Sequence, residues 1–400
     1  MKLIEFKEYN NLDSERSLNK KKIIGFMITA VIIVLAITFS VVYACNKTFR
    51  NWADIHILMK SISEGSLSSI DIDVDEDVSV YAYDRYIAVL KDNKLNIYNS
   101  SGKSTASLDI NISTPVFTAN GKYLAVAEKG KQKIYLISGT KTKWSNDIEG
   151  TISKVSVNEN GYVSVICSGT TYKSVIIVFD QNGNQLIKSY IPSNSVIDSA
   201  VSSDNKYLSF AEISTDGTIV QSRIKTISIQ EAKEKEKKSE TIINNVTSQS
   251  DSTILNLKYQ DSNRLICMYD DSVHLIQNGT DEELFSLKED GQKVVFADVE
   301  LNNYTFRILE KNSLLSTQST VEFMNIGSKK TNIYTVDSVI KEVYVNSNLI
   351  ALNLGSEVYF VGTNGWLNKK YTSSQEVRKI VMNNEFAGIV YRDKIEIINL

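Results

Sequence analysis

The fold is decided by a short repeated stretch, of which the clearest copy begins with NGKYLAVA at residues 120–127. It continues with KIYLI at residues 133–137 and ends in a turn at Gly139. Asn-Gly pairs close tight hairpins because both residues tolerate a positive φ. The small and aliphatic residues that follow suit a strand covered on both faces, where small side chains let neighbouring sheets approach. The stretch therefore predicts a β-hairpin inside a stack of sheets.

The same pattern returns along the chain. Residues 84–89 with 94–98, and 160–165 with 175–179, are two clear copies, and further copies begin at Asn205, Asn263, Asn303, Asn348 and Asn384. A more polar segment such as residues 104–110 supplies a fourth strand. Eight units over residues 67–400 average about 42 residues each, inside the range of about 40–50 for propeller blades. The predicted fold class is all-β: a β-propeller of eight four-stranded blades, preceded by one transmembrane α-helix.

The two ends of the repeated region predict how the ring closes. The last unit supplies residues 377–382, 385–392 and 394–399 and lacks a fourth strand. The segment Ser68–Val74 is a spare strand in which apolar and polar residues alternate. We expect it to pair with Lys394–Asn399 and so remove an exposed sheet edge. The alternative is a seven-bladed ring with a separate terminal hairpin.

A membrane segment precedes the repeats. Residues 23–44 carry no charge, and as a helix of about 33 Å they would cross a hydrocarbon core of about 30 Å. Lys20–Lys22 stand immediately before this span, which favours a cytoplasmic N-terminus and an extracytoplasmic C-terminal part. Residues 1–22 are then the cytoplasmic segment, residues 23–44 the transmembrane helix in the cell membrane, and residues 67–400 the extracytoplasmic propeller.

Two alternatives involve cleavage of this segment. A secretory signal has an apolar region of about 7–15 residues, shorter than this one. A lipoprotein signal ending at Cys45 would place a small residue where the bulky Tyr43 stands. We therefore favour an uncleaved single-pass anchor.

Residues 45–66 predict a helical connector. Phe49, Trp52, Ile55 and Met59 recur at spacings of three or four, which is one face of a helix. The alternative is a helix that mediates dimerisation.

The repeated hairpins resemble β-propellers of the WD40-like and quinoprotein-like kind. The Gly-His and Trp-Asp dipeptides of WD40 repeats are absent. Gly139–Trp144 is one approximate copy of the quinoprotein motif Thr-Gly-Lys-x-x-Trp, out of register, so no quinone cofactor is implied. The chain as a whole resembles a family of bacterial single-pass membrane proteins with an extracytoplasmic propeller that is known as a domain of unknown function.

The histidines and cysteines predict no metal or catalytic site. His56 falls in the connector and His274 in a strand of blade five, and neither has a cysteine or second histidine nearby in sequence. We expect His274 to be an ordinary strand histidine. Cys167 and Cys267 lie in apolar strands and are expected to be buried free thiols.

Two acidic stretches are interpreted as solvated. Asp71, Asp73 and Asp75, with Glu76 and Asp77, resemble the start of a calcium loop but lack its later glycine and glutamate; calcium bound in another geometry remains open. Residues 231–240 alternate Glu and Lys and are expected to form a loop in blade four, with a docking role as the alternative.

Composition excludes one class of partner. The chain carries a net charge of −3 and residues 1–44 are basic, so the extracytoplasmic part is mildly acidic and lacks the basic footprint of a nucleic-acid-binding protein.

The predicted function is a protein- or glycan-interaction module of the bacterial cell envelope, and neither a catalytic motif nor a cofactor site is recognised. The alternative is an envelope glycan hydrolase or lyase with its site in the propeller funnel. Acidic, tyrosine or arginine side chains converging on one mouth of the channel would favour the enzyme, and a flat polar or aromatic face would favour the binding module.

Overall fold

The computed structural model describes residues 20–46, 49–50, 53, 57, 68–72, 78–169, 171–214, 220–234, 242–247, 252–289, 291–312 and 317–400. The chain forms two compact units, residues 1–60 and residues 61–400. Each unit is described by itself.

The first unit is dominated by the helix α1 (Lys20–Cys45). Its stretch Met27–Cys45 is long and apolar enough to cross a membrane. Most of the predicted connector, His56 included, lies outside the described residues. Where the connector is described, the Ile57 N–H donates to the carbonyl of Ala53 over 2.9 Å, an i to i−4 bond of the helical type.

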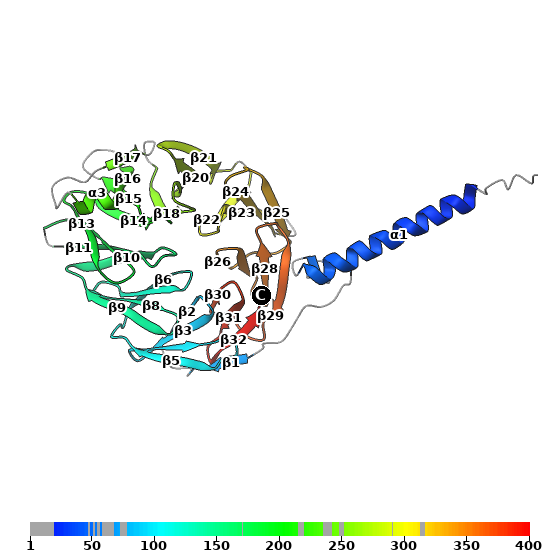
Figure 1. The fold of residues 1–400 in the computed structure, drawn as a ribbon, viewed down its shortest axis with the longest axis horizontal. Helices are drawn as coiled ribbons and strands as arrows, with labels where there is room; N and C mark the ends of the chain where they lie inside the picture. Colours follow the sequence, from blue (N-terminus) through cyan, green and yellow to red (C-terminus); the bar gives the residue numbers. More distant parts are fainter. Residues whose placement is uncertain are drawn as a thin grey trace, which may run out of the picture. The chain divides into compact units, whose positions relative to one another are not determined.

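The second unit confirms the predicted fold: eight four-stranded antiparallel sheets are arranged in a ring (Figure 1). The first four blades, each written from the channel outward, are β2 (Ser79–Tyr83), β3 (Tyr86–Lys91), β4 (Lys94–Tyr98), β5 (Ser104–Asp109); β6 (Pro115–Asn120), β7 (Tyr123–Glu128), β8 (Lys133–Ser138), β9 (Lys141–Asp147); β10 (Thr151–Val157), β11 (Val163–Ser168), β12 (Ser174–Phe179), β13 (Gln185–Ile191); and β14 (Ser195–Val201), β15 (Tyr207–Ser214), β16 (Gln221–Ser228), β17 (Ile242–Thr247).

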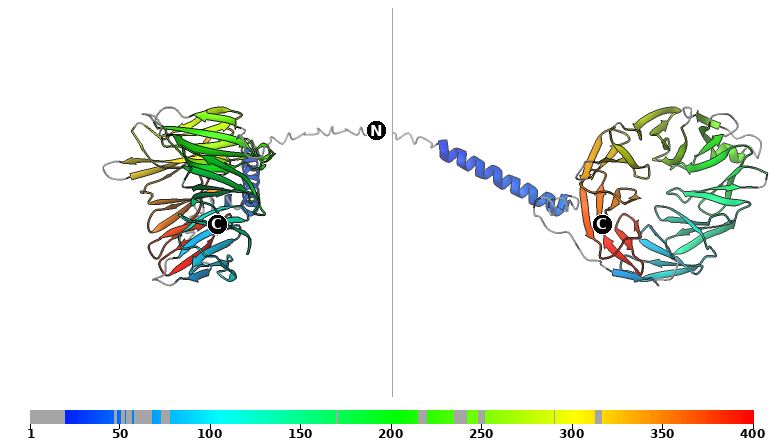
Figure 2. Two further views of the ribbon diagram at one scale, coloured as in Figure 1. Left: turned by 90° about the vertical axis from the view of Figure 1, so that its left-hand side faces the viewer. Right: turned by 180° about the vertical axis from the view of Figure 1, so that it is seen from behind.

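The remaining blades follow the same plan, and Figure 2 shows the ring edge-on and from behind. They are β18 (Ile254–Tyr259), β19 (Arg264–Tyr269), β20 (Ser272–Gln277), β21 (Thr280–Ser286); β22 (Lys293–Asp298), β23 (Tyr304–Asn312), β24 (Thr317–Asn325), β25 (Thr331–Val336); β26 (Glu342–Asn346), β27 (Leu349–Asn353), β28 (Glu357–Gly362), β29 (Leu367–Thr372); and β30 (Lys379–Met382), β31 (Phe386–Val390), β32 (Lys394–Asn399), completed by β1 (Ser68–Asp71).

The predicted closure of the ring is confirmed. β1 pairs antiparallel with β32, with Ser68 opposite Ile397 and Ile70 opposite Ile395. Ile70 is buried in a cluster that joins blade eight to blade one. The Ser68 hydroxyl donates to the Ser100 carbonyl over 3.2 Å, which joins the closing strand to blade one as well. Gly102, at the same turn, has a φ of +71°, and a Cβ there would lie only 2.9 Å from the Ser69 carbonyl. Asp73, Val74, Asp75, Glu76 and Asp77 lie outside the described residues.

The core consists of apolar clusters between neighbouring blades. β7 and β12 are buried along their whole length because each lies in the middle of a sheet with another sheet on either face. Ala125, Leu136 and Val165, for example, belong to one cluster between blades two and three. Each aliphatic side chain buried in this way contributes about 1.5–3 kcal/mol.

The innermost strands are of two kinds. β10, β14, β18 and β22 each have a register shift against their neighbouring strand. β2, β6, β26 and β30 pair without a shift. A bulge of this type turns the following side chains relative to the sheet. The two halves of the ring therefore present different side-chain patterns to the channel.

The prediction of a loop at the start of residues 231–240 was wrong. Where the sequence favoured a loop from Glu231, the chain forms a short helix, α3 (Ile229–Glu234), between β16 and β17 of blade four. Ser228 caps it, since its Oγ accepts the Glu231 N–H over 3.3 Å, and Ile229 is buried. Residues 235–240 lie outside the described residues.

Candidate binding site in the central channel

The centre of the ring contains a cavity of about 650 Å³. It is lined by the ends of β2, β6, β18, β26 and β30 and by the chain that follows β22. Amide side chains are frequent at its mouth: Asn120, Asn302, Asn346, Asn383 and Asn384. These asparagines belong to the hairpin turns of the repeat, so the residues that close each blade also give the mouth its polar character.

Blades one and eight contribute an aromatic and cationic wall. The Tyr81 ring stacks on Phe117 with centroids 5.4 Å apart. Lys379 donates from Nζ to the Val80 carbonyl over 2.8 Å and lies 5.9 Å from the Tyr81 ring centroid. The surrounding walls desolvate the Lys379 ammonium and lower its pKa. Burial, together with the Glu300 charge, raises the pKa of Tyr81 to about 12, so its hydroxyl is a hydrogen-bond donor at neutral pH.

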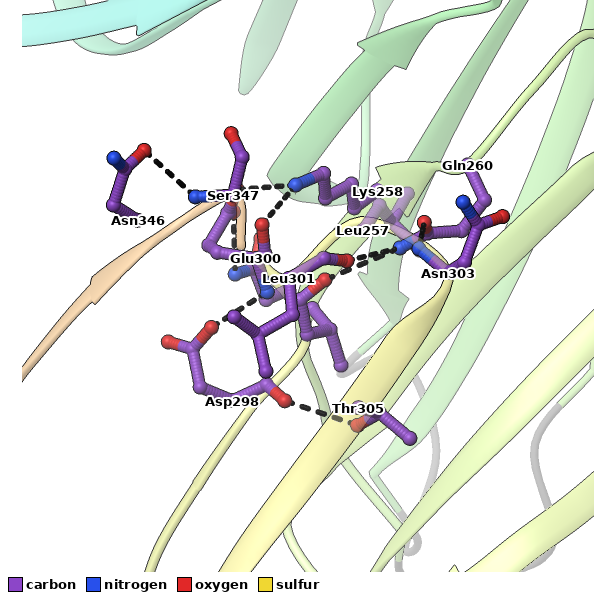
Figure 3. Close-up of polar contacts among 12 residues, drawn as sticks. Leu257, Lys258, Gln260, Asp298, Glu300, Leu301, Asn303, Thr305, Asn346 and Ser347 are labelled. Carbon is purple, nitrogen blue, oxygen red and sulfur yellow. Dashed lines mark hydrogen bonds and ion pairs between the residues drawn. The ribbon is translucent and has the colours of Figure 1, made fainter. Parts of the chain in front are cut away.

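The opposite wall carries the acidic groups shown in Figure 3. Lys258 at the end of β18 forms an ion pair with Glu300, at 3.4 Å between Nζ and Oε2, and also donates to the Glu300 carbonyl. Asp298 Oδ1 accepts the Glu300 N–H over 2.6 Å. Burial, and then the neighbouring Glu300 charge, raises the pKa of Asp298 to about 7. Asp298, the last residue of β22, is therefore a proton-binding group at neutral pH, next to Glu300.

Hydrogen bonds between blades hold this wall in place (Figure 3). Gln260 accepts the Asn303 N–H over 2.7 Å and donates to the Leu301 carbonyl over 2.9 Å. The Asn302 N–H donates to the Ser347 carbonyl over 2.6 Å, which joins blades six and seven. The mouth is thus a preorganised set of donors and acceptors.

His274 has partners that the sequence did not reveal. Its Nδ1 lies 2.8 Å from Asp281 Oδ1 and its Nε2 lies 2.9 Å from Ser272 Oγ. The three atoms are ordered as in a catalytic triad. Ser272 is buried, however, and its hydroxyl is also bonded to Asp271 over 3.1 Å. The interpretation of His274 as an ordinary strand histidine stays a prediction.

The cysteines and possible metal ligands complete the comparison with the sequence, as far as the structure describes them. Cys167 and Cys267 are free and buried, as predicted. Within the part of the chain that the structure describes, no group of three His, Cys, Asp or Glu side chains is placed to hold a metal ion.

The sequence missed the channel residues themselves, above all Tyr81, Lys258, Glu300 and Lys379, and it missed Asp298, which bonds the Glu300 N–H. The only local signal is a charged residue at the end of an otherwise apolar strand, as in VVFAD followed by VE at residues 294–300. The carboxylates Asp84, Glu300 and Glu385 line the same cavity as the tyrosines. The composition expected of an enzyme mouth and the amide-rich surface expected of a binding module therefore occur together.

Solved structures with the same fold are distant in sequence. The C-terminal WD40 domain of Sif2 has a TM-score of 0.54 at 12% identity, covering 83% of this chain and 99% of that chain. Sqt1 from Chaetomium thermophilum has a TM-score of 0.52 at 11% identity, covering 84% and 98%. Dihydro-heme d1 dehydrogenase NirN, in complex with DHE, has a TM-score of 0.51 at 10% identity, covering 80% and 72%. At these identities the likeness shows the β-propeller fold alone.

No curated protein sequence matches the chain. Residues 63–400, the whole region of the repeats, match the model described as "Family of unknown function (DUF5711)". Because that match covers most of the sequence, the chain belongs to the DUF5711 family.

Proposed function

We propose that this protein is a membrane-anchored propeller that binds a glycan of the cell envelope in its central channel. The observation that carries the proposal is the cavity of about 650 Å³ at the channel mouth. This volume lies within the range of about 300–1,000 Å³ typical of small-ligand sites. Sugars carry many hydroxyl groups, and the mouth offers amides, tyrosine hydroxyls and ammonium groups held in fixed positions.

A glycan fits this site better than a folded protein partner does. A specific protein interface buries about 800 Å² on each side and needs a broad surface. The channel mouth is instead a concave site in which interspersed Lys122, Lys258 and Lys379 are balanced by Asp84, Glu300 and Glu385. Such a balance suits an uncharged polar ligand.

The anchor in this proposal is α1, inserted as a single span with residues 1–22 in the cytoplasm and the propeller outside. The length and apolar character of Met27–Cys45 support the span, and Lys20–Lys22 support the orientation.

The proposal is tested by titrating envelope glycan oligosaccharides against the full-length protein. Tyr81→Phe removes one hydroxyl from the channel and keeps the stacking on Phe117, so affinity should fall about tenfold. Tyr123→Phe is the matched control, because the Tyr123 hydroxyl bonds Gln181 over 3.2 Å and does not line the cavity. Equal affinity of both variants and wild type, or no binding of any glycan, would contradict the proposal.

A second candidate function is hydrolysis of the bound glycan. It is favoured by Asp298, because a carboxyl group with a pKa near 7 can act as a general acid, and by the neighbouring Glu300, which lines the cavity. Asp298→Asn should then abolish release of reducing ends while glycan binding persists. A wild-type protein that binds glycan but releases no product would contradict hydrolysis and would support binding as the only function of the channel.

A further inference from the structure

A second cavity of about 350 Å³ lies between blades six and seven, along the facing strands β22 and β26. We name it the apolar slot. Its walls are formed mainly by Val295, Phe296, Ile308, Ile340 and Val343, and its lining also includes Lys341, Glu342 and Tyr344. Every residue of β22 after the first, and every residue of β26 after the first, remains half-buried. In β12, by contrast, each residue is fully buried. Two apolar strands thus face each other without filling the space between them.

The bulge in β22 builds one wall of the slot. Successive side chains of a regular strand point to opposite faces. The register of β22 shifts between Val294 and Phe296, and the consecutive residues Val295 and Phe296 both line the cavity. The Phe296 ring rests on Phe306, with centroids 5.8 Å apart, and Phe306 is fully buried. The wall is therefore supported from within blade six.

Tyr344 lines both the apolar slot and the channel cavity. Its hydroxyl donates to Glu342 over 2.6 Å, and Glu342 also accepts from Asn353 Nδ2 over 3.2 Å. These bonds hold the ring at the boundary between the two cavities. One side of this boundary is polar and the other is apolar.

We infer that the ligand of the channel is amphiphilic, with its polar head in the channel cavity and an acyl chain in the apolar slot. The identity of the head as a glycan rests on the proposed function. The acyl chain is argued from the slot itself, because a narrow gap between two sheets admits an extended chain, and covering half-exposed apolar walls with hydrocarbon is favourable. Because Tyr344 lines both cavities, the two are neighbours, which favours one ligand that contacts Tyr344 from both.

The test uses a palmitate analogue that carries a photoactivatable diazirine, added to membranes that contain the full-length protein. After irradiation, labelled peptides are mapped by mass spectrometry. We expect label in peptides that contain Val295–Phe296 or Ile340–Tyr344. Label in α1 serves as the internal reference.

Variants make the test specific to the slot. Val343→Trp should reduce label in the propeller at least tenfold while label in α1 stays constant. Val339→Trp is the matched control, because Val339 is exposed, lies four residues away and does not line the slot. Should Val343→Trp disturb folding, Val343→Thr retains the shape, adds a hydroxyl group and should lower the label several-fold.

Label confined to α1, label spread evenly over all blades, or undiminished label in Val343→Trp and Val343→Thr would overturn the inference. These outcomes are distinct from failure of the proposed function. If the protein binds glycan but the slot is not labelled, the acyl chain is contradicted and the glycan site stands. If the slot is labelled but no glycan binds, the acyl chain stands and the head group of the ligand is not a glycan.

Discussion

At the scale of single residues, two aspartates on inner strands show how neighbouring groups determine the role of a carboxyl group removed from solvent. Asp198 accepts hydrogen bonds from the N–H groups of Leu257 and Ser199, both at 2.8 Å, and pairs with Lys154 Nζ at 2.8 Å. Asp298 accepts one N–H from Glu300 and faces that residue's negative charge. Burial raises the pKa of both carboxyl groups, but Asp198 has an ammonium partner and joins blades three, four and five, whereas Asp298 lies beside the Glu300 charge.

Asp298→Asn tests that proton-binding role through pH. In the folded protein the pKa of Asp298 is about 7, above its ordinary value of 3.8, so the native state binds the proton more tightly than the unfolded state. This contribution to stability is complete below about pH 3.8 and is lost as the pH rises through about 7. The melting temperature of the wild type should fall relative to Asp298→Asn across this range. Parallel melting profiles from about pH 4 to pH 8 would show that Asp298 has an ordinary pKa.

Lys154→Met tests the buried ion pair. Removal of one partner leaves the Asp198 charge buried, and the free energy of unfolding should fall by about 3–5 kcal/mol. Lys133→Met is the matched control, because Lys133 pairs at 3.0 Å with Asp147, whose side chain is 71% exposed; its loss should cost less than about 1 kcal/mol. Urea unfolding measures both values, and equal losses would mean that Asp198 is neutral in the wild type.

At the scale of elements, the hairpins could be predicted because their signals are local. Asp84, Asn205 and Asn303 adopt φ values of +47°, +61° and +57°, the left-handed conformation that the turn residues of each repeat indicated. The closing strand could also be predicted, since an alternating strand at one end matched a missing strand at the other. The helix α3 could not, because its cap and its buried Ile229 depend on tertiary packing.

The candidate site could not be predicted for a related reason. Tyr81 in blade one and Glu300 after blade six are brought to one cavity only by the closed ring. The bulge that turns Val295 and Phe296 to the same side is a register shift between strands. The repeats predict the ring, but they do not predict which side chains of each inner strand line the channel, and a bulge has no signature in the order of apolar residues.

Deletion of residues 67–75 from the full-length chain tests the closing strand. Loss of β1 removes the partner of β32 and the buried side chain of Ile70, so blade eight would present an open edge. We expect a lower melting temperature and concentration-dependent aggregation, measured by light scattering in detergent solution. A monomeric profile with unchanged melting would mean that β1 is dispensable for closure.

At the scale of the whole molecule, the proposal combines a single membrane span with a rigid ring that has one polar cavity and one apolar slot. The central cavity receives residues from blades one, two, five, six, seven and eight together. A ligand there contacts many blades at once, which favours preorganised binding.

The proposed topology predicts a simple protection pattern. Protease added to intact spheroplasts should digest the propeller and spare residues 1–22, because Lys20–Lys22 retain the N-terminus in the cytoplasm. Immunoblotting with tags at each terminus measures the result. A protected propeller would reverse the orientation, and recovery of the propeller in the soluble fraction would indicate cleavage after α1.

The most direct test of glycan binding in the channel is site-specific photocrosslinking in native membranes. A photoreactive amino acid is placed at Asn302, which is exposed and lines the cavity, and in a second variant at Asn182, which is exposed on an outer turn of blade three. Mass spectrometry of the purified protein then identifies what is attached. We predict a sugar-containing adduct at Asn302 and none at Asn182. Adducts without sugar at Asn302, or the same adducts at both positions, would contradict glycan binding in the channel.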